Sequence, residues 1–285
     1  MSNRPEITDA PAAPPQANTK AGASSVGKTN KKAGESWIET VKTIVYALLI
    51  AFVIRTFLFQ PFNIPSGSME NTLLVGDYLF VEKFAYGYSR YSFPFGIPPF
   101  PGRIFGSSPH RGDVVVFKMP NPDSPDYMKD FIKRVIGLPG DRVQMIGGQL
   151  WLNGKAVPKV RVADFVTAEP PCPMATDAGP DGFYHVPRYR ETLPGGKSYF
   201  VLDCIQNGPS DNTPVYVVPP GHYFMMGDNR DNSADSRADV GYVPAQDLEG
   251  RAVIIFFSIN DSAVWYEPWT WPTAIRYNRI LTLID

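Results

Sequence analysis

Asp130-Phe131-Ile132-Lys133-Arg134-Val135-Ile136-Gly137-Leu138-Pro139-Gly140-Asp141 is an apolar run that ends in a turn-forming Leu-Pro-Gly-Asp. The pattern predicts a β-strand followed by a tight turn. Neighbouring residues of a strand face opposite sides, which puts Lys133 and Phe131 on one face and Ile132 and Arg134 on the other. On an inward face, burial would lower the lysine pKa from about 10.4, and a neutral lysine can act as general base on a serine hydroxyl. A solvated lysine at a strand edge is the alternative interpretation of this stretch.

Strand-like runs continue on both sides of this stretch. Ile146-Gly147-Gly148-Gln149 and Leu152-Asn153-Gly154-Lys155 are signals for hairpin turns. The 29 prolines and 24 glycines suit a protein with many turns better than a helical one. The sequence therefore predicts a mainly β fold, with strands at 78–82, 113–118, 142–146, 149–152, 198–202, 215–218, 223–226 and 252–257.

The N-terminal region divides into a polar tail and an apolar segment. Residues 1–36 carry almost no large apolar side chains, which predicts a disordered tail. Residues 37–59 would form a helix of about 35 Å, enough to cross a bilayer as a signal anchor. A buried core helix is one alternative. A cleaved signal peptide is another, but no small-x-small site closes the apolar run.

The charges around this segment predict its orientation. Its N-terminal side carries Lys28, Lys31, Lys32 and Lys42. By the positive-inside rule, the tail is expected in the cytoplasm and the chain after Gln60 outside it.

A serine-rich turn lies directly after the apolar segment 37–59. In Phe62-Asn63-Ile64-Pro65-Ser66-Gly67-Ser68-Met69-Glu70, proline and glycine alternate with two serines, which favours a tight, exposed turn suited to a nucleophile. Pro-Ser-Gly-Ser is also a common loop sequence. Nine residues lead from Phe59 to Ser68 and reach at most about 30 Å. Ser68 is therefore expected near the membrane surface.

A third segment, Gly227-Asp228-Asn229-Arg230-Asp231-Asn232-Ser233-Ala234-Asp235-Ser236-Arg237, is dense in carboxylates. A calcium loop of the EF-hand type fails in every register, because no glycine follows the third ligand and no glutamate closes the loop. A structural turn with pairing between aspartate and arginine fits better.

Several functional classes are disfavoured. A net charge of -1 argues against a nucleic-acid-binding face. The three histidines are scattered and fall in no metal or triad motif. Cys172 and Cys204 fit no zinc pattern, and their pairing stays open. The Ser-x-x-Lys pattern of penicillin-binding proteins is absent around Ser66 and Ser68.

Taken together, the three segments resemble bacterial type I signal peptidases. Two further matching stretches, Gly76-Asp77-Tyr78 through Val81-Glu82-Lys83-Phe84-Ala85-Tyr86-Gly87 and Arg111-Gly112-Asp113-Val114-Val115-Val116-Phe117, lie between them in the order of the family. The resemblance covers roughly residues 40 to 260. It implies a catalytic region at 60–285 of two antiparallel β domains, the second inserted at about 145–221, behind an N-terminal transmembrane helix.

The resemblance also implies roles for single residues. Ser68 matches the nucleophile, Lys133 the general base, and Ser66 the side chain that joins the Ser68 backbone N–H in the oxyanion hole. Ser233 matches a serine that orients the lysine, and Asp235 and Arg237 match a supporting ion pair. Candidates for the substrate pockets are Phe62, Ile64, Pro65, Leu73, Leu79, Val116, Phe131 and Ile132.

The expected activity is removal of signal peptides after small-x-small sites. An extended peptide shows alternate side chains to an enzyme, so two shallow pockets would accept small residues one and three positions before the cut. The expected partners are secreted preproteins and membrane lipid, without metal or organic cofactor. The expected place is the bacterial inner membrane, with one span and a periplasmic catalytic region.

The chain departs from the family in places. Asn71 stands where the family often has proline, and one anchor helix is evident where some relatives have two. The C-terminal aromatics and arginines suit either a membrane surface or ordinary packing. A self-cleaving Ser/Lys repressor is a second enzyme hypothesis, disfavoured by the anchor. A membrane-tethered β scaffold without catalysis is the non-enzyme hypothesis, disfavoured because Ser68 and Lys133 are both present.

Overall fold

The N-terminal helix is longer at one end and shorter at the other than the sequence pattern predicted. The structure, a computed structural model, describes residues 33–93, 96–97, 99–172, 178–264 and 266–284. Helix α1 spans Ala33–Phe57, so 33–36 are helical, whereas 1–32 of the expected tail lie outside the described residues. Trp37–Phe57 has a mean hydropathy of 1.9, its residues 37–55 are exposed, and it has the length and composition to cross a membrane.

The helix ends at Phe57, two residues before the end predicted from the sequence. Leu58 N–H donates to the Ile54 carbonyl at 2.8 Å, which is the last helical bond, and the Leu58 carbonyl accepts from Lys83 N–H at 2.9 Å. Phe59 is therefore the first residue of strand β1 (Phe59–Asn63), paired with β2, and not the end of the helix. The chain turns directly from the apolar helix into the sheet that carries the serine turn.

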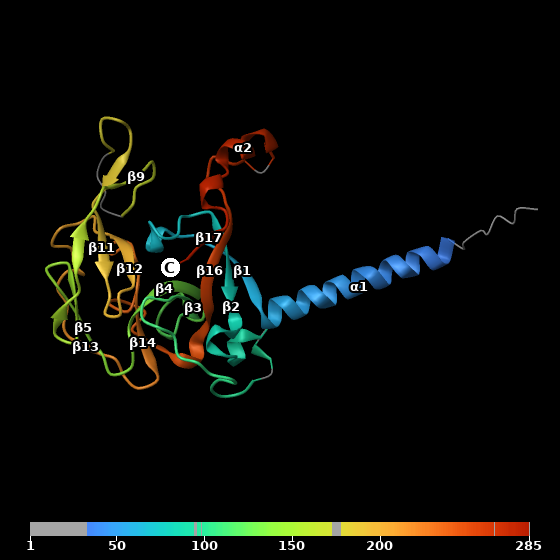
Figure 1. The fold of residues 1–285 in the computed structure, drawn as a ribbon, viewed down its shortest axis with the longest axis horizontal. Coiled ribbons are helices and arrows are strands. Elements are labelled where there is room, and N and C mark those ends of the chain that lie inside the picture. The colour runs from blue at the N-terminus through green and yellow to red at the C-terminus, as the bar shows by residue number, and fades with distance from the viewer. Residues whose placement is uncertain (1–32, 94–95, 98, 173–177, 265, 285) are drawn as a thin grey trace, which may run out of the picture. The chain divides into compact units, whose positions relative to one another are not determined.

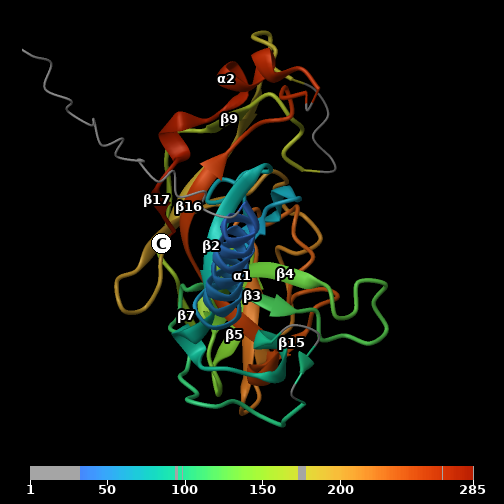
Figure 2. The same cartoon turned by 90° about the vertical axis from the view of Figure 1, so that its right-hand side faces the viewer.

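Residues 47–285 form one compact unit built around an antiparallel sheet. The strands follow the order β1-β2-β16-β3-β4-β14-β15, and β17 pairs with β16 (Figure 1). Figure 2 shows β2, β16 and β17 running beside one another. Their bounds are Asp77–Glu82 for β2, Val114–Lys118 for β3, Asp130–Gly137 for β4, His222–Met226 for β14, Tyr242–Pro244 for β15, Leu248–Ser258 for β16 and Thr282–Leu283 for β17.

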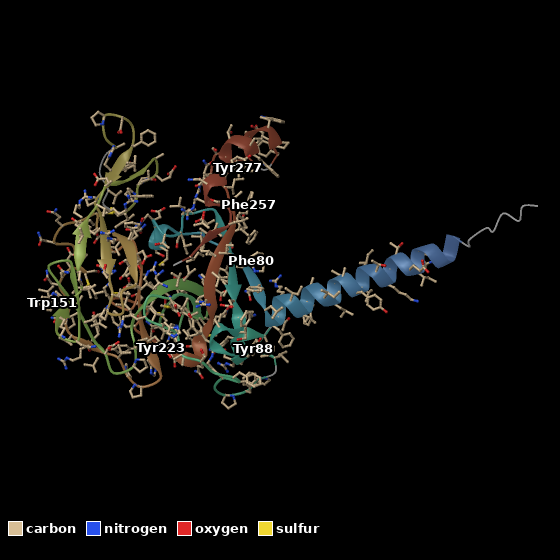
Figure 3. All side chains as sticks on the ribbon, in the orientation of Figure 1. Phe80, Tyr88, Trp151, Tyr223, Phe257 and Tyr277 are labelled. Carbon is tan, nitrogen blue, oxygen red and sulfur yellow. The ribbon has the colours of Figure 1, made fainter. Side chains whose placement is uncertain are left out.

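Alternation along β2 divides the two faces of this sheet. Leu79 and Val81 are buried, whereas Tyr78 and Phe80 point away from that core. Phe80 stacks on Phe256 of β16 with ring centroids 4.4 Å apart. The labels Phe80 and Phe257 in Figure 3 mark strands β2 and β16. The period-2 pattern of a half-buried strand thus gives one apolar core and one aromatic outer face.

A second set of strands lies between β4 and β14 in the chain. These strands form sheets of four (β13-β5-β6-β7), three (β12-β11-β8) and two strands (β10-β9). Their bounds are Arg142–Ile146 for β5, Gln149–Leu152 for β6, Lys155–Ala156 for β7, Lys159–Arg161 for β8, Phe165–Thr167 for β9, Tyr184–Val186 for β10, Arg188–Thr192 for β11, Ser198–Leu202 for β12 and Tyr216–Val217 for β13. One apolar cluster joins Ile136 of β4 and Phe224 of β14 to Val143 and Leu150 of this set. A domain boundary at about 145–221 stays a prediction.

The eight expected strands are all present, with ends shifted by a few residues. The hairpin turns are also confirmed: Gly147 and Gly148, and then Asn153 and Gly154, all have positive φ, as the favoured two-residue turns require. Strands β8 to β10 escaped prediction because each has only three residues, and β11 because it is rich in charged residues.

The two cysteines are free thiols in this structure. Burial raises the pKa of the Cys204 thiol, and a hydrogen bond with Cys172 raises it further. The two side chains are therefore neighbours.

Candidate active site

Ser68 and Lys133 meet although 65 residues separate them. Ser68 lies in a short 3-10 turn, Gly67–Met69, and Lys133 lies in β4 opposite Val115 of β3. Lys133 Nζ is 2.7 Å from Ser68 Oγ, and the lysine is 4% exposed. The strand pairing fixes the lysine backbone, so its long side chain reaches the turn from a rigid support.

Burial sets the charge state of this lysine. Removal from water lowers the pKa of Lys133 from 10.5 to about 8, although the charges of Asp235 and Asp228 act in the opposite direction. Besides the serine, Lys133 Nζ contacts the Ile132 carbonyl at 3.1 Å and lies 5.3 Å from the centre of the Phe131 ring. A substantial fraction of this lysine is therefore neutral near pH 8, and a neutral amine can accept a proton.

The opposite face of β4 is also buried. Arg134 has no exposed surface, and its guanidinium pairs with both carboxylate oxygens of Asp228 at 2.9 and 2.7 Å. Thr72 Oγ1 donates to the same carboxylate at 2.5 Å. The strand alternation was predicted correctly, but both of its faces lie inside the protein. Sequence reasoning anticipated Asp–Arg pairing within the carboxylate-rich segment, and it missed this pair between two distant segments.

Asn229 is a second residue that sequence reasoning missed. Its backbone N–H donates to the Ser68 carbonyl at 3.1 Å, and its side-chain amide donates to the carbonyls of Gly67 at 3.2 Å and Pro171 at 2.7 Å. Asn229 has no exposed surface. It therefore holds the serine turn against the 171 segment, and its place in the carboxylate-rich segment was the only signal in the sequence.

Ser66 lies on the exposed side of the turn. Its Oγ is 3.4 Å from Ser68 Oγ, and either atom can be the donor. A Cβ at Gly67 would stand 2.9 Å from the side-chain Cδ of Glu70. Glycine therefore permits the tight approach of Glu70 to the turn.

The expected supporting residues Asp235, Arg237 and Ser233 differ in their hydrogen bonding. Asp235 and Arg237 form a buried ion pair at 2.8 Å, and Asp235 also accepts from Gly227 N–H at 3.0 Å. Burial opposes the charge of Asp235, but Arg237 outweighs it and keeps the pKa of Asp235 low. Among the residues that the structure describes, the buried Ser233 hydroxyl has no hydrogen-bond partner. Ser233 Oγ and the Ser68 carbonyl oxygen both lie against Gly227, within 2.2 and 2.5 Å of where a Cβ would stand.

The predicted pocket residues mostly gather in one apolar cluster. Leu73, Leu79 and Val116 have no exposed surface and can shape a pocket only from beneath. Pro65 is exposed, and Phe131 packs on a neighbouring cluster. The cluster also contains Met69, which follows Ser68 and was not selected from the sequence. Its members among the candidates are Phe62, Ile64, Leu73, Leu79, Val116 and Ile132.

Three carboxylates gather away from this site. Oxygens of Asp203, Asp211 and Asp231 lie within 4.8 Å of one another. Asp231 accepts from the backbone N–H groups of Cys204 and Ile205, and Asp203 pairs with Lys159 at 2.6 Å. These contacts hold the 203–211 loop against the carboxylate-rich segment. The three carboxylates therefore stabilise the fold.

A buried lysine that touches a hydroxyl and has a pKa near 8 can activate that hydroxyl without a histidine. This is chemistry of a serine endopeptidase, here behind a helix with the length of a membrane anchor.

Comparisons with known proteins agree with the chemistry of a serine endopeptidase. The family model described as "Signal peptidase, peptidase S26" matches residues 37–257. Signal peptidase I of Rickettsia conorii is 39% identical over 271 residues, covering 88% of this chain and 93% of the relative. Signal peptidase I of Rickettsia prowazekii is 40% identical over 233 residues, covering 79% and 81%. The chain belongs to the signal peptidase family, peptidase S26.

A solved structure is also similar. The crystal structure of a signal peptidase I from Enterococcus faecalis V583 matches with a TM-score of 0.27 and 26% identity, covering 51% of this chain and 97% of the other.

Proposed function

We propose that this membrane-anchored serine endopeptidase removes N-terminal signal peptides from exported preproteins with Ser68 as nucleophile and Lys133 as general base. The observation that carries this proposal is the 2.7 Å contact between Ser68 Oγ and the buried Lys133 Nζ. The family membership of the chain supports the substrate class, because the curated relatives are signal peptidases.

The proposed reaction proceeds in two halves. Lys133 Nζ takes the hydroxyl proton while Ser68 Oγ attacks the scissile carbonyl carbon. The negative oxygen that forms accepts hydrogen bonds from the Ser68 N–H and the Ser66 hydroxyl. The lysine then gives its proton to the departing amine, which leaves an acyl ester on Ser68. Water, deprotonated by the same lysine, hydrolyses that ester and releases the signal peptide.

The surrounding residues support this chemistry by position. Asp235, fixed by Arg237, lies near enough to Lys133 to stabilise its transient positive charge. Ser233 is proposed to orient the lysine. Its unpartnered hydroxyl lies beside Gly227 and the serine turn, so a small rotation on substrate binding would suffice.

Substrate choice is proposed to reside in the apolar cluster. Ile64 and Ile132 are nearly buried beside the serine and lysine, and Phe62 covers their cluster. Such a surface offers shallow apolar contact and no charged partner. It would accept small side chains one and three positions before the cut and exclude large ones.

The proposed topology is a single span in the bacterial inner membrane. The tail with its lysines would lie in the cytoplasm, and the catalytic region, including the proposed second domain at about 145–221, would lie in the periplasm. Phe57 supports a close junction between helix and body, because its ring packs edge-on against Tyr88 and Phe93 at 6.0 and 5.8 Å. The reactive serine would then work close to membrane lipid.

The test compares detergent-solubilised wild-type enzyme with Ser68→Ala on a preprotein carrying a small-x-small site. Cleavage at that site should disappear in Ser68→Ala and persist in Ser108→Ala, which changes an exposed serine far from the turn in sequence. Lys133→Ala should be inactive, while Lys129→Ala, at a lysine whose side chain is 65% exposed, should be active. Persisting cleavage in Ser68→Ala would place the nucleophile elsewhere, and Ser66 would be tested next.

A further inference from the structure

A cavity begins beside the reactive serine and is not used by the chemistry above. It has a volume of about 790 Å³, and four parts of the chain line it. The serine turn contributes Gly67 and Glu70, strand β9 and its continuation contribute 165–170, the carboxylate-rich segment contributes Asn232, and the C-terminal region contributes 260–262 and Arg276. A cavity of this size holds several side chains or a short peptide.

The position of the cavity suggests which part of a substrate it receives. Gly67 precedes Ser68 directly, yet none of the eight candidate pocket residues lines this cavity. A polypeptide bound across Ser68 must continue on both sides of the scissile bond. Because the apolar cluster is proposed to bind the residues before the cut, the residues after the cut need a separate path. The cavity provides one.

We propose that this cavity binds the first residues of the mature protein, those directly after the cut, and that Glu70 selects among them by charge. The proposal rests on the proposed function and adds a specificity-determining residue to it.

The position of Glu70 supports this role. Its carboxylate lies over the serine turn, since a Cβ on Gly67 would stand about 3 Å from both of its oxygens. A residue directly after the cut must leave Ser68 past this turn. Glu70 is therefore among the first side chains that the mature segment would meet.

The cavity carries an excess of acidic groups. Glu70, Glu169 and Asp261 line it together with one cation, Arg276. That arginine is already engaged, because its guanidinium donates to the carbonyls of Val75 at 2.5 Å and Ile259 at 3.0 Å and pairs with Asp77. Burial raises the pKa of Glu70 to about 7, against the opposing effects of Arg276 and Asn229. Above pH 7, a basic side chain would be attracted here and an acidic one repelled.

One wall of the cavity favours an extended peptide. Within the described ranges, β9 pairs only with β10, so its other edge is left without a strand partner. The residues 165–170 that line the cavity are continuous with this edge. An unpaired strand edge offers backbone donors and acceptors to a peptide that adds as a further strand. Backbone pairing would hold the mature segment whatever its sequence, and Glu70 would then add the preference for charge.

The experiment uses the full-length enzyme in detergent at pH 8.5, where Glu70 is charged. Three peptides share one signal sequence and differ only in carrying Lys, Gln or Glu at the second position after the cut. We expect wild type to cleave the Lys peptide with a kcat/KM about fivefold above that of the Glu peptide. Glu70→Gln should bring this ratio close to one, and Glu70→Lys should invert it. Asp123→Asn, at an exposed acid outside the cavity, should keep the wild-type ratio.

The results separate this inference from the proposed function. If wild type cleaves none of the three peptides, the proposed function fails first. If it cleaves all three with equal kcat/KM, or if the ratio survives in both Glu70 variants, Glu70 does not select by charge. Should a Glu70 variant fail to fold, Glu169→Gln serves as the second test, because it removes charge from the same cavity and should lower the ratio.

Discussion

At the scale of single residues, the charge state of Lys133 should govern the pH dependence of cleavage. Its pKa of about 8 means that the neutral fraction grows about tenfold per pH unit below 8 and levels off above it. The kcat/KM for a peptide substrate should follow this curve between pH 6 and 9. Measurements in a Glu70→Gln background remove the other acid of the region that titrates near pH 7. A flat profile from pH 6 to 8 would contradict lysine as the base.

The burial of Lys133 should also lower the free energy of unfolding. An unfolded lysine keeps its proton up to about pH 10.4, whereas Lys133 in the folded state releases it at about 8, so the folded state binds fewer protons between these values. Wild-type stability should therefore rise with pH across this window. Lys133→Met avoids burial of a charge and should be about 3 kcal/mol more stable at pH 6, at about 1.4 kcal/mol for each tenfold change in proton affinity. Urea unfolding at pH 6 and pH 10.5 should show this gain shrinking at the higher pH.

At the scale of elements, the Arg134–Asp228 pair joins β4 to the segment after β14. Both side chains are almost completely buried, so Asp228→Asn leaves an uncompensated guanidinium and should cost about 3–5 kcal/mol of unfolding free energy. Asp126→Asn breaks an ion pair to Lys129 whose side chains are 44% and 65% exposed, and it should cost less than about 1 kcal/mol. Equal costs, measured by chemical denaturation, would show that burial does not decide the strength of these pairs.

The elements also show how far sequence reasoning extends. Alternation identified β2, a continuous apolar run identified β3, and glycine-containing turns identified the hairpins. Asn229 and Arg134 could not be placed, because their roles depend on partners from distant segments. The acidic cavity was equally hidden, since Glu70, Glu169 and Asp261 come from three separated parts of the chain. Short-range sequence patterns predict the strands, whereas the site depends on contacts between segments that are distant in the chain.

At the scale of the whole molecule, α1 should act as a tether and not as part of the catalyst. Ser68 and Lys133 belong to the turn and strand of the body, whereas residues 37–55 of α1 are all exposed. Deletion of residues 1–50 keeps Phe57, whose ring packs against Tyr88 and Phe93. The shortened chain should therefore fold, which circular dichroism can check.

Tethering changes the local concentration of enzyme near a membrane-bound substrate without changing the site. The shortened chain should cleave a soluble peptide with a kcat/KM within about twofold of full-length enzyme in detergent. On a preprotein inserted in liposomes, the full-length enzyme in the same bilayer should be faster by about 10²-fold, the gain expected when a second binding event becomes intramolecular. A loss of equal size on both substrates would instead make α1 part of the catalytic structure. Equal rates on the liposome substrate would show that the body finds the membrane without its helix, and the exposed aromatics Trp269 and Tyr277 would be the next residues to change.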